Sequence, residues 1–433
     1  MSAKQPHRRR PHAKPRGVLG MVGRLGPGLI TGAADDDPSG VATYSQAGAQ
    51  FGPNMLWTLV LTYPLMVAVQ LLSARIGRVT GAGLAANMSQ VLPKPAVGLL
   101  VGLLFVANTI NIGADLAAMG AAGNLVTGWN AKMLTVVFLV VSLGLQLFVP
   151  YHRYVYFLKW ATLALFAYVG VIFTVHIDWL QIAIHTILPA FKPDAASLTV
   201  IVAVFGTTIS PYLFFWQSSE EVEDLVAAHE PDLKHASAAT AKRELRRIRW
   251  DTFIGMAFSN VIAFFIILTT AVTLHAAGKT DIQTSADAAI ALKPIAGPLA
   301  FSLFSLGIVG TGLLATPVLA GSSAYAISES FGWKFGLEHE PWEAPGFYAV
   351  IVAAMVLGLG VMLSPLDPIK ALFWSAVVNG VISVPIMAAM MLVGSRRHEM
   401  GRFVAGISLT IFGWAATVVM AVAVIAMFAF GGF

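Results

Sequence analysis

Three consecutive carboxylates, Asp35–Asp37, stand inside an otherwise apolar stretch, GPGLITGAADDDPSGVATYSQAGAQ (residues 26–50). Charged side chains at the centre of a bilayer cost about 3 kcal/mol each even on lenient insertion scales. Pro38 removes a backbone donor and Gly40 permits unusual backbone angles, so we expect the helix to break here. A break at membrane depth is tolerated only where the unwound chain lines a cavity or binds a ligand. The stretch therefore predicts two half-helices that meet at an ion site.

A second interruption follows in SLTVIVAVFGTTISPYLFFWQSSEEVE (residues 197–223), which is apolar on both sides of GTTISP. Neither break contains Cys, His or Met, so the candidate ligands are all oxygens. They are the Asp37 carboxylate, with those of Asp35 and Asp36 as further candidates, freed carbonyls, and the hydroxyls of Ser39, Thr207 and Ser210. An all-oxygen shell with carboxylate charge suits hard divalent ions such as Mg²⁺, Ca²⁺ or Mn²⁺. The small residues around the acids favour an ion that keeps part of its water shell, as Mg²⁺ does.

The whole chain has the composition of a polytopic membrane protein. Of its 433 residues 57% are hydrophobic and 11% are charged, and the mean hydropathy is +0.75. The absence of cysteine excludes a disulfide framework or a thiolate metal site and leaves the redox compartment open. Runs long enough to cross a bilayer recur throughout. We expect eleven helical spans, near residues 20–50, 54–77, 96–126, 131–149, 156–176, 197–223, 250–275, 297–328, 346–364, 369–393 and 404–430.

Basic residues are distributed unevenly between the two sides that these spans define. With the N-terminus in the cytoplasm, 22 of the 27 Lys and Arg lie inside, many of them in the predicted loop KRELRRIR (residues 242–249). The others are Lys132, Lys192, Lys279, Lys293 and Lys370. This asymmetry predicts a multi-pass cell-membrane protein with a cytoplasmic N-terminus. Residues 1–19, which are basic and contain proline, are expected to form a disordered cytoplasmic tail.

The positions of the two breaks indicate an internal repeat. Pro38 lies in the first span and Pro211 in the sixth, so each break falls in the first helix of a five-span half. We expect two inverted repeats, residues 20–176 and 197–393, joined by an outer connection (177–196) and followed by an eleventh span (404–430). Interrupted helices at matching positions of inverted repeats are typical of a midplane substrate site in a secondary transporter.

Two segments resemble the signatures of a known family. GPGLITGAADDDPSGVATYSQAGAQFG is similar to the first-helix signature of the Nramp divalent-metal transporters, whose core usually reads Asp-Pro-Gly-Asn. GTTISPYLFFWQS is similar to their sixth-helix signature, which usually contains Met-Pro-His. The resemblance covers spans 1–3 and 6–8. It implies an all-α LeuT-type fold of two inverted five-helix repeats plus an eleventh helix. It also implies that the carbonyls of Ala34 and Thr207 face the ion.

Several departures from the family pattern narrow this expectation. Gly40 replaces the asparagine ligand, Ser210 the methionine, and Tyr212 the histidine two positions on. Asp115 matches a family acid, but Ala118 stands where the family has a glutamate further along its proton path. The soft thioether ligand, which favours manganese, iron and cadmium, is thus missing together with two proton-handling residues. The chain looks like the Nramp-related magnesium transporter branch, for which transport uncoupled from protons is expected.

The predicted ion site is made of Asp37, Ala34, Gly40, Thr207 and Ser210. Residues expected to lie in an outer shell or to attract the ion are Asp35, Asp36, Ser39, Tyr212 and Asn379. Asp115 is a candidate relay; the alternative is that it pairs with Asn108, Asn111 or the first break. Asn379 serves equally well in helix–helix hydrogen bonding. The acidic group 220–224 is expected to be a solvated helix end, or else to concentrate cations at the inner mouth.

These residues predict a transporter or facilitator of a hard divalent cation, foremost Mg²⁺ and also Mn²⁺, that works by alternating access without proton coupling. The alternative is a proton-coupled Mn²⁺/Fe²⁺ symporter of the ordinary Nramp type. A remote alternative is an intramembrane aspartyl hydrolase built on Asp37 and Asp115, although no catalytic motif surrounds Asp115 and hydrolysis does not explain Pro211. We expect no enzyme activity and no cofactor, with the metal ion as substrate. The expected partners are that ion and the lipid bilayer; no nucleic acid or protein partner is implied.

Overall fold

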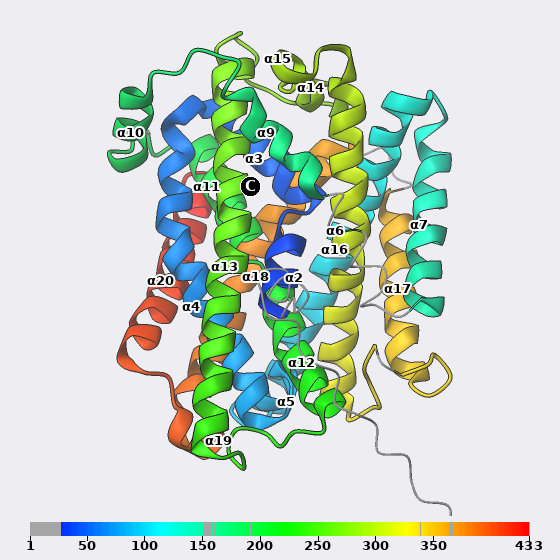
Figure 1. Cartoon of the computed structure of the whole chain (residues 1–433), viewed down its shortest axis with the longest axis vertical. Helices are drawn as coiled ribbons and strands as arrows, with labels where there is room; N and C mark the ends of the chain where they lie inside the picture. The colour runs from blue at the N-terminus through cyan, green and yellow to red at the C-terminus, as the bar shows by residue number, and fades with distance from the viewer. Residues whose placement is uncertain are drawn as a thin grey trace, which may run out of the picture.

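The protein forms a bundle of long helices that run along one common direction (Figure 1). The structure is a computed structural model that describes residues 27–149, 158, 162–190, 192–337, 339–362 and 367–432. The regular secondary structure of these residues is helical throughout, without strands. The predicted tail (1–19), the start of the first predicted span and most of the first half of the fifth lie outside the described residues.

The principal helices follow the predicted spans closely. They are α2 (Pro27–Asp35), α3 (Pro38–Phe51), α4 (Leu56–Thr80), α6 (Lys94–Thr127), α7 (Ala131–Phe148), α9 (Phe166–Val171), α11 (Ala195–Thr208), α12 (Pro211–Ala228), α13 (Ala238–Thr270), α16 (Ala300–Phe331), α17 (Pro345–Met362), α18 (Pro368–Ser395) and α20 (Ile407–Ala429). Short helices lie in the connections: α5 (Leu84–Met88) and α19 (Arg397–Met400) at one end, α10 (Trp179–Ile187), α14 (Ser285–Ile290) and α15 (Lys293–Ala296) at the other.

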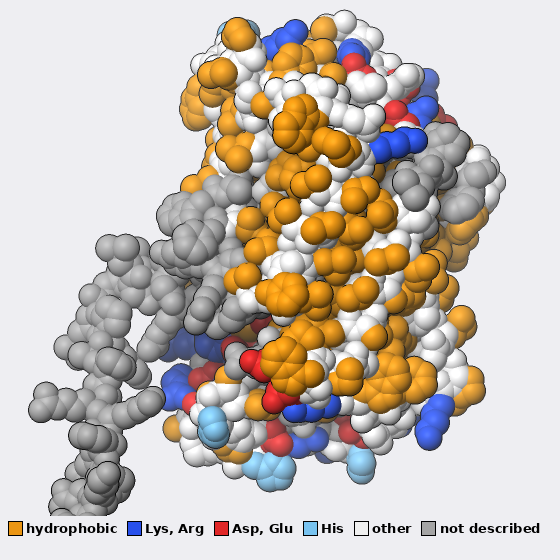
Figure 2. Space-filling view, turned by 90° about the vertical axis from the view of Figure 1, so that its right-hand side faces the viewer, with side chains coloured by type: hydrophobic (Ala, Val, Ile, Leu, Met, Phe, Trp, Pro, Cys, Tyr) orange, Lys and Arg blue, Asp and Glu red, His pale blue; other side chains and the backbone are white. Residues whose placement is uncertain are grey.

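Eight helical stretches among the described residues are long and apolar enough to cross a membrane. Eleven spans were expected, and the difference has three sources. Spans 1 and 2 merge into the single stretch Pro38–Thr80, and the apolar part of span 9, Pro345–Gly360, is shorter than the others. The start of the fifth span lies outside the described residues, and its described α-helix, α9, is short. Figure 2 shows apolar side chains over the middle of one face and charged side chains toward its two ends, as a membrane-embedded protein requires.

The first broken helix is seated against α13 along its whole length. Both α2 and α3 pack against α13. A Cβ at Gly32 would lie 2.2 Å from the Gly255 carbonyl oxygen, and one at Gly48 would lie 2.2 Å from the Ile267 carbonyl oxygen. Because such distances are never seen for real side chains, glycine is required at both positions. Behind the break, α6 packs against α16, α18, α7 and α17.

The segment 242–249 differs from its prediction as a loop, since α13 begins already at Ala238. Ser237 caps the helix by accepting from the Thr240 amide, and Ala, Lys, Arg, Glu and Leu are strong helix formers. Arg247 then reaches Glu244, one turn away, at 2.9 Å and Glu221 of α12 at 2.5 Å. Arg78 of α4 joins the same group, 3.1 Å from Glu244.

The acidic group 220–224 is a solvated helix end only in part, since Asp224 is exposed whereas Glu221 is buried. The Glu221 side chain is 0% exposed and is paired with Arg247, while Glu223 accepts from the Tyr325 hydroxyl at 2.5 Å. These carboxylates face α13 and α16 because arginine and tyrosine side chains there compensate their burial. They fasten α4, α12, α13 and α16 together at the end of the bundle that carries α5 and α19 (Figure 1).

Candidate functional site

The first break separates α2 from α3 and is stabilised by its own last acid. Asp37 is the N-cap of α3, with φ −66° and ψ 169°, and Pro38 occupies the first helical position. The Asp37 Oδ1 atom accepts from the Ser39 hydroxyl and from the Gly40 amide, both at 2.7 Å. A carboxylate at an N-cap satisfies free amides and lies at the positive end of the helix dipole. The break is thus built by the sequence Asp-Pro-Ser-Gly itself.

The second break separates α11 from α12 and is organised differently. The helix ends at Thr208, Ile209 leaves helical geometry (φ −119°, ψ 56°), and Pro211 begins α12. Ser210 makes no cap to the helix that follows it. Its hydroxyl instead donates back to the carbonyl oxygens of Gly206 at 2.7 Å and Thr207 at 2.9 Å. The negative end of α11 is therefore partly satisfied by its own chain.

The two breaks lie against each other. A Cβ at Gly40 would be 3.2 Å from Thr207 Oγ1 and 3.3 Å from the Asp35 carbonyl oxygen, so the small residue permits the close approach. The Tyr212 hydroxyl donates to the Ala34 carbonyl oxygen across the gap at 3.2 Å. The structure thus brings Gly40 next to Thr207 and Ala34 next to Tyr212, so the two predicted segments meet. The Ala34 and Thr207 carbonyls, expected to face the ion, each accept a hydrogen bond from the second break.

Asp35 and Asp36 share one hydrogen-bond donor that sequence reasoning missed. The Ser259 hydroxyl of α13 lies 2.5 Å from Asp35 Oδ2 and 3.2 Å from Asp36 Oδ1. The other carboxylate oxygens, Asp35 Oδ1 and Asp36 Oδ2, have no hydrogen-bond partner in the described part of the chain. A lone serine in a long apolar helix is a weak signal, since such residues usually bond within their own helix or to a neighbour.

Asp115 lies beside Asp37 and is joined to it by Asn111. The Asn111 amide nitrogen donates to Asp37 Oδ2 at 3.0 Å and to Asp115 Oδ2 at 3.1 Å. Its oxygen accepts from Ser375 at 2.9 Å and from Asn379 at 3.4 Å, both on α18. Asn379 therefore reaches the site through Asn111. The sequence signal for Asn111 was its position one helical turn before an acid in the membrane.

The four acids concentrate negative charge at the breaks. Asp35, Asp36, Asp37 and Asp115 are each at most 1% exposed. Within the described residues no lysine or arginine forms an ion pair with any of them. In the part of the chain that the structure describes, no group of three or more His, Cys, Asp or Glu side chains converges to hold a metal alone. Buried carboxylates need a compensating charge, and this arrangement fits a cation held by one or two carboxylates, carbonyls and water.

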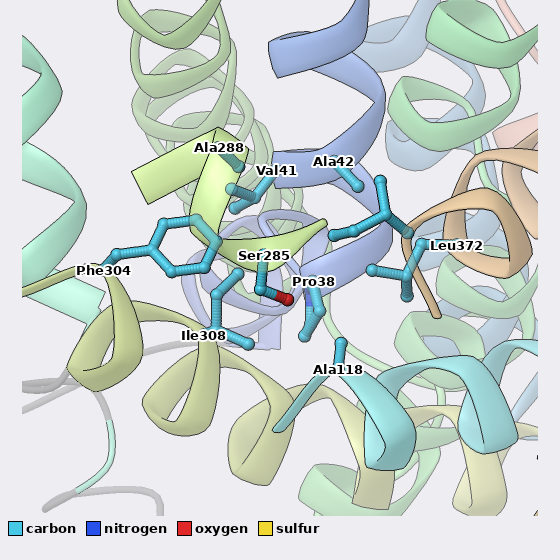
Figure 3. Close-up of a pocket in the computed structure, with 10 residues that line it drawn as sticks. Pro38, Val41, Ala42, Ala118, Ser285, Ala288, Phe304, Ile308 and Leu372 are labelled. Atoms are coloured by element: carbon cyan, nitrogen blue, oxygen red, sulfur yellow. The ribbon is translucent and has the colours of Figure 1, made fainter. Parts of the chain in front are cut away.

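A small pocket adjoins the first break on the side facing α14 (Figure 3). It is lined by Pro38, Val41, Ala42, Ala118, Ser285, Ala288, Phe304, Ile308, Ile369 and Leu372. Almost all of these side chains are apolar, and Ala118 contributes a methyl group where the resemblance leads one to look for a glutamate. The pocket thus brings no further charge to the ion site.

Two facing helix breaks with buried acids at the centre of a membrane bundle define this protein as a secondary transporter in architecture. The chain belongs to the Nramp family, whose model, described as natural resistance-associated macrophage protein-like, matches residues 28–429. It is 28% identical over 387 residues to the divalent metal cation transporter MntH of Acidiphilium cryptum, covering 87% of this chain and 83% of the relative. It is 26% identical over 424 residues to MntH of Deinococcus radiodurans, covering 94% and 90%.

Solved structures agree on the fold. A crystal structure of a mutant manganese transporter from Eremococcus coleocola superposes with a TM-score of 0.75 at 14% identity, covering 96% of this chain and 87% of that one. The transporter MhsT, solved with L-phenylalanine, gives a TM-score of 0.62 at 13% identity and coverages of 95% and 98%. The predicted LeuT-type fold with two inverted five-helix repeats and an eleventh helix is thereby confirmed.

Membership in a family of transporters argues against the hydrolase reading, and the geometry agrees. Asp37 and Asp115 do lie together, as that reading required. However, the Asn111 amide stands between their carboxylates and donates to both. An aspartyl dyad works by sharing one proton directly between two carboxyl groups. These two acids are arranged to surround a donor.

Proposed function

We propose that this chain carries a divalent cation across the cell membrane by alternating access at a site between its two broken helices. The observation that carries the proposal is the set of four buried carboxylates at the first break, which have no cationic partner among the described residues. Relatives along most of the chain are named as divalent metal cation transporters. The metal is the substrate, and Asp37 is the ligand that we assign to it first.

We further propose that Mg²⁺ is preferred and Mn²⁺ is a second substrate. The side chains supplied by the two breaks are oxygen donors, and Ser210 stands where a thioether would favour softer metals. The Eremococcus coleocola protein of similar structure is named as a manganese transporter, and this name supports a Mn²⁺/Fe²⁺ carrier better than a Mg²⁺ carrier. The donor chemistry of this chain is what favours Mg²⁺.

Competition for uptake decides between these two candidates. The purified protein in liposomes is offered Mg²⁺ together with Mn²⁺, Ca²⁺ or Cd²⁺. We expect Mg²⁺ and Mn²⁺ to compete with each other, with Cd²⁺ ineffective. Strong competition by Cd²⁺ together with no Mg²⁺ uptake would establish the Mn²⁺/Fe²⁺ alternative. Uptake of no divalent ion above that of protein-free liposomes would reject the transport proposal itself.

Uncoupled transport is the third part of the proposal. Tyr212 lies at the position of the family histidine, and its hydroxyl donates to a backbone carbonyl. Ala118 is a methyl group in an apolar pocket. Neither residue exchanges a proton near neutral pH. We expect metal uptake to leave the pH inside liposomes unchanged, as reported by an entrapped pH dye. Acidification that depends on the metal and saturates with it would show proton coupling.

The membrane potential alone is enough to drive accumulation if the N-terminus is cytoplasmic, as we propose from the distribution of basic residues. Inward movement of a divalent ion across roughly 100 mV, negative inside, is favourable by about 4.6 kcal/mol. The division into repeats at residues 20–176 and 197–393 is part of the same proposal, because it places the two breaks at matching depth in opposite halves. Labelling of single cysteines introduced at Lys132 and Arg402 from outside the cell tests the orientation: only the first should react.

A further inference from the structure

We propose that Asn111 is a positioning residue that turns the Asp37 carboxylate so that one oxygen, Oδ2, meets the transported cation. The inference rests on the proposed function and assigns a role to a residue that is not itself a metal ligand. Asn111 lies in α6, is fully buried, and contacts the first break, Asp115 and α18 at the same time.

First, the two carboxylate oxygens of Asp37 differ in how many hydrogen bonds they already accept. Each carboxylate oxygen accepts two hydrogen bonds. Oδ1 already accepts from the Ser39 hydroxyl and the Gly40 amide at 2.7 Å. Among the described residues, Oδ2 accepts from Asn111 alone, at 3.0 Å. Oδ2 is therefore the oxygen of Asp37 with a lone pair left for a cation. Its hydrogen bond from Asn111 helps to set where that lone pair points.

The second step is the orientation of the Asn111 amide. Its nitrogen donates to the two acids, and its oxygen accepts from Ser375 and Asn379 of α18. These four bonds use the full capacity of the side chain. The reverse orientation would place the amide oxygen against two carboxylate oxygens. The network thus fixes which end of the amide faces the acids.

The third step is the effect on a bound cation. Because Oδ2 is already held in place, the Asp37 side chain loses less conformational entropy when the cation binds, as in other preorganised sites. The same amide keeps Asp115 next to Asp37, and Asp115 Oδ1 has no partner in the described part of the chain. Removing the amide frees the Asp115 carboxylate and leaves the Asp37 carboxylate held only through Oδ1, so that Oδ2 is no longer fixed. The expected result is weaker binding of the ion rather than slower movement of the helices.

Asn108 is a matched control in the same helix. It is also fully buried, and its amide nitrogen makes three hydrogen bonds, to the Leu319 carbonyl at 3.0 Å and to the hydroxyls of Ser322 and Ser323 at 2.9 Å. These groups all belong to α16, and no hydrogen bond joins it to the four acids. Asn108→Ala therefore removes comparable packing and hydrogen bonding without touching Asp37.

The test measures uptake of Mg²⁺ and Mn²⁺ into liposomes by wild type, Asn111→Ala and Asn108→Ala, with direct binding of both ions by calorimetry. We expect Asn111→Ala to raise the KM and the Kd about tenfold, the size of losing a hydrogen bond to a charged group, with maximal rate changed less than about twofold. Asn108→Ala should lower thermal stability at least as much and leave KM unchanged. Equal KM for Asn111→Ala and wild type, or equal KM shifts in the two variants, would overturn the inference.

Ser375→Ala keeps the test informative if Asn111→Ala does not fold. It removes a hydroxyl that lies 2.9 Å from the Asn111 amide oxygen and 2.7 Å from the Leu372 carbonyl, so that its one proton is shared between them. We expect the KM to rise in the same direction by about threefold. An unchanged KM in a folded Ser375→Ala protein counts against the inference. A wild-type protein that takes up neither ion rejects the proposed function instead, so the two failures are distinguished.

Discussion

The two helix breaks look alike in the sequence but differ in the direction of their hydrogen bonds. In the first, Asp37 faces forward and caps α3 through the Gly40 amide. In the second, Ser210 faces backward and donates to the carbonyls at the end of α11. The first break is therefore anionic and presents free acceptor capacity, while the second is neutral and partly satisfies its own carbonyls. A proline at the restart of a helix does not by itself show which break holds the ion.

This difference implies an unequal division of work. We propose that the first break supplies the charge that attracts and binds the cation, with Asp115 of α6 adding a further carboxylate and Asn111 holding the two acids in place. The second break packs against the first, since the Tyr212 hydroxyl donates to the Ala34 carbonyl and Thr207 lies against Gly40. Variants of the first break should therefore have large effects on ion affinity, and variants of the second should have small effects or change selectivity.

The largest effect is expected for Asp37→Asn. Asparagine is as good an N-cap as aspartate, so α3 should still begin at Pro38, but the ligand charge is lost. We expect uptake to fall on the order of 100-fold or more, equivalent to about 2.7 kcal/mol. The measurement is the initial rate in liposomes with matched amounts of protein. Asp194→Ala, at the N-cap of α11, controls for loss of a cap, and near-normal uptake by Asp37→Asn would refute the assignment.

A smaller effect is expected for Ser259→Ala, which removes the donor shared by Asp35 and Asp36. The two buried, charged carboxylates then lose the hydroxyl that donates to them, and we expect the region around the ion to rearrange. We expect the KM for Mg²⁺ to rise about five- to tenfold. Ser383→Ala in α18, whose hydroxyl donates to the Gly380 carbonyl of its own helix, provides the control. Equal behaviour of the two serine variants would mean that Asp35 and Asp36 do not contribute to binding.

Ser210→Met tests whether the second break sets selectivity rather than affinity. A thioether placed between the breaks favours softer ions, so we expect Mn²⁺ and Cd²⁺ to gain about tenfold relative to Mg²⁺. The measurement is the ratio of uptake rates in mixtures of two ions. Ser210→Ala loses the same hydroxyl without adding sulfur and should leave the ratio unchanged. A selectivity shift shared by both variants would assign the effect to the lost hydroxyl.

The smallest effect is expected for Tyr212→Phe, which removes only the hydrogen bond to the Ala34 carbonyl. The freed carbonyl remains available to the ion, so we expect the KM to change by no more than about threefold. The pH inside the liposomes should still not change during uptake. A loss of uptake comparable to that of Asp37→Asn would place the two breaks on an equal footing and contradict the ranking.

Much of the framework could be predicted from the sequence because it depends on local signals. Long apolar runs mark the helices, and Pro38 and Pro211 mark the places where two of them restart. The contacts of Asn111 and Ser259 could not be predicted in this way, since each depends on which faces of α6 and α13 turn toward the break. The same limit explains Glu221: its burial depends on Arg247 of another helix, and no local pattern announces that pair.

The first broken helix contacts α13 at two glycines where the backbones touch directly, and this limits how the helix can move. Gly32 rests against Gly255 on one side of the break and Gly48 against Ile267 on the other, so both halves share a single unbroken support of 33 residues. Tilting one half alone would have to part backbones that touch without any side chain between them. We therefore expect α2, α3 and α13 to move as one rigid body when the ion is exposed to either side of the membrane. Asp37 would move with this body and would not act as a hinge.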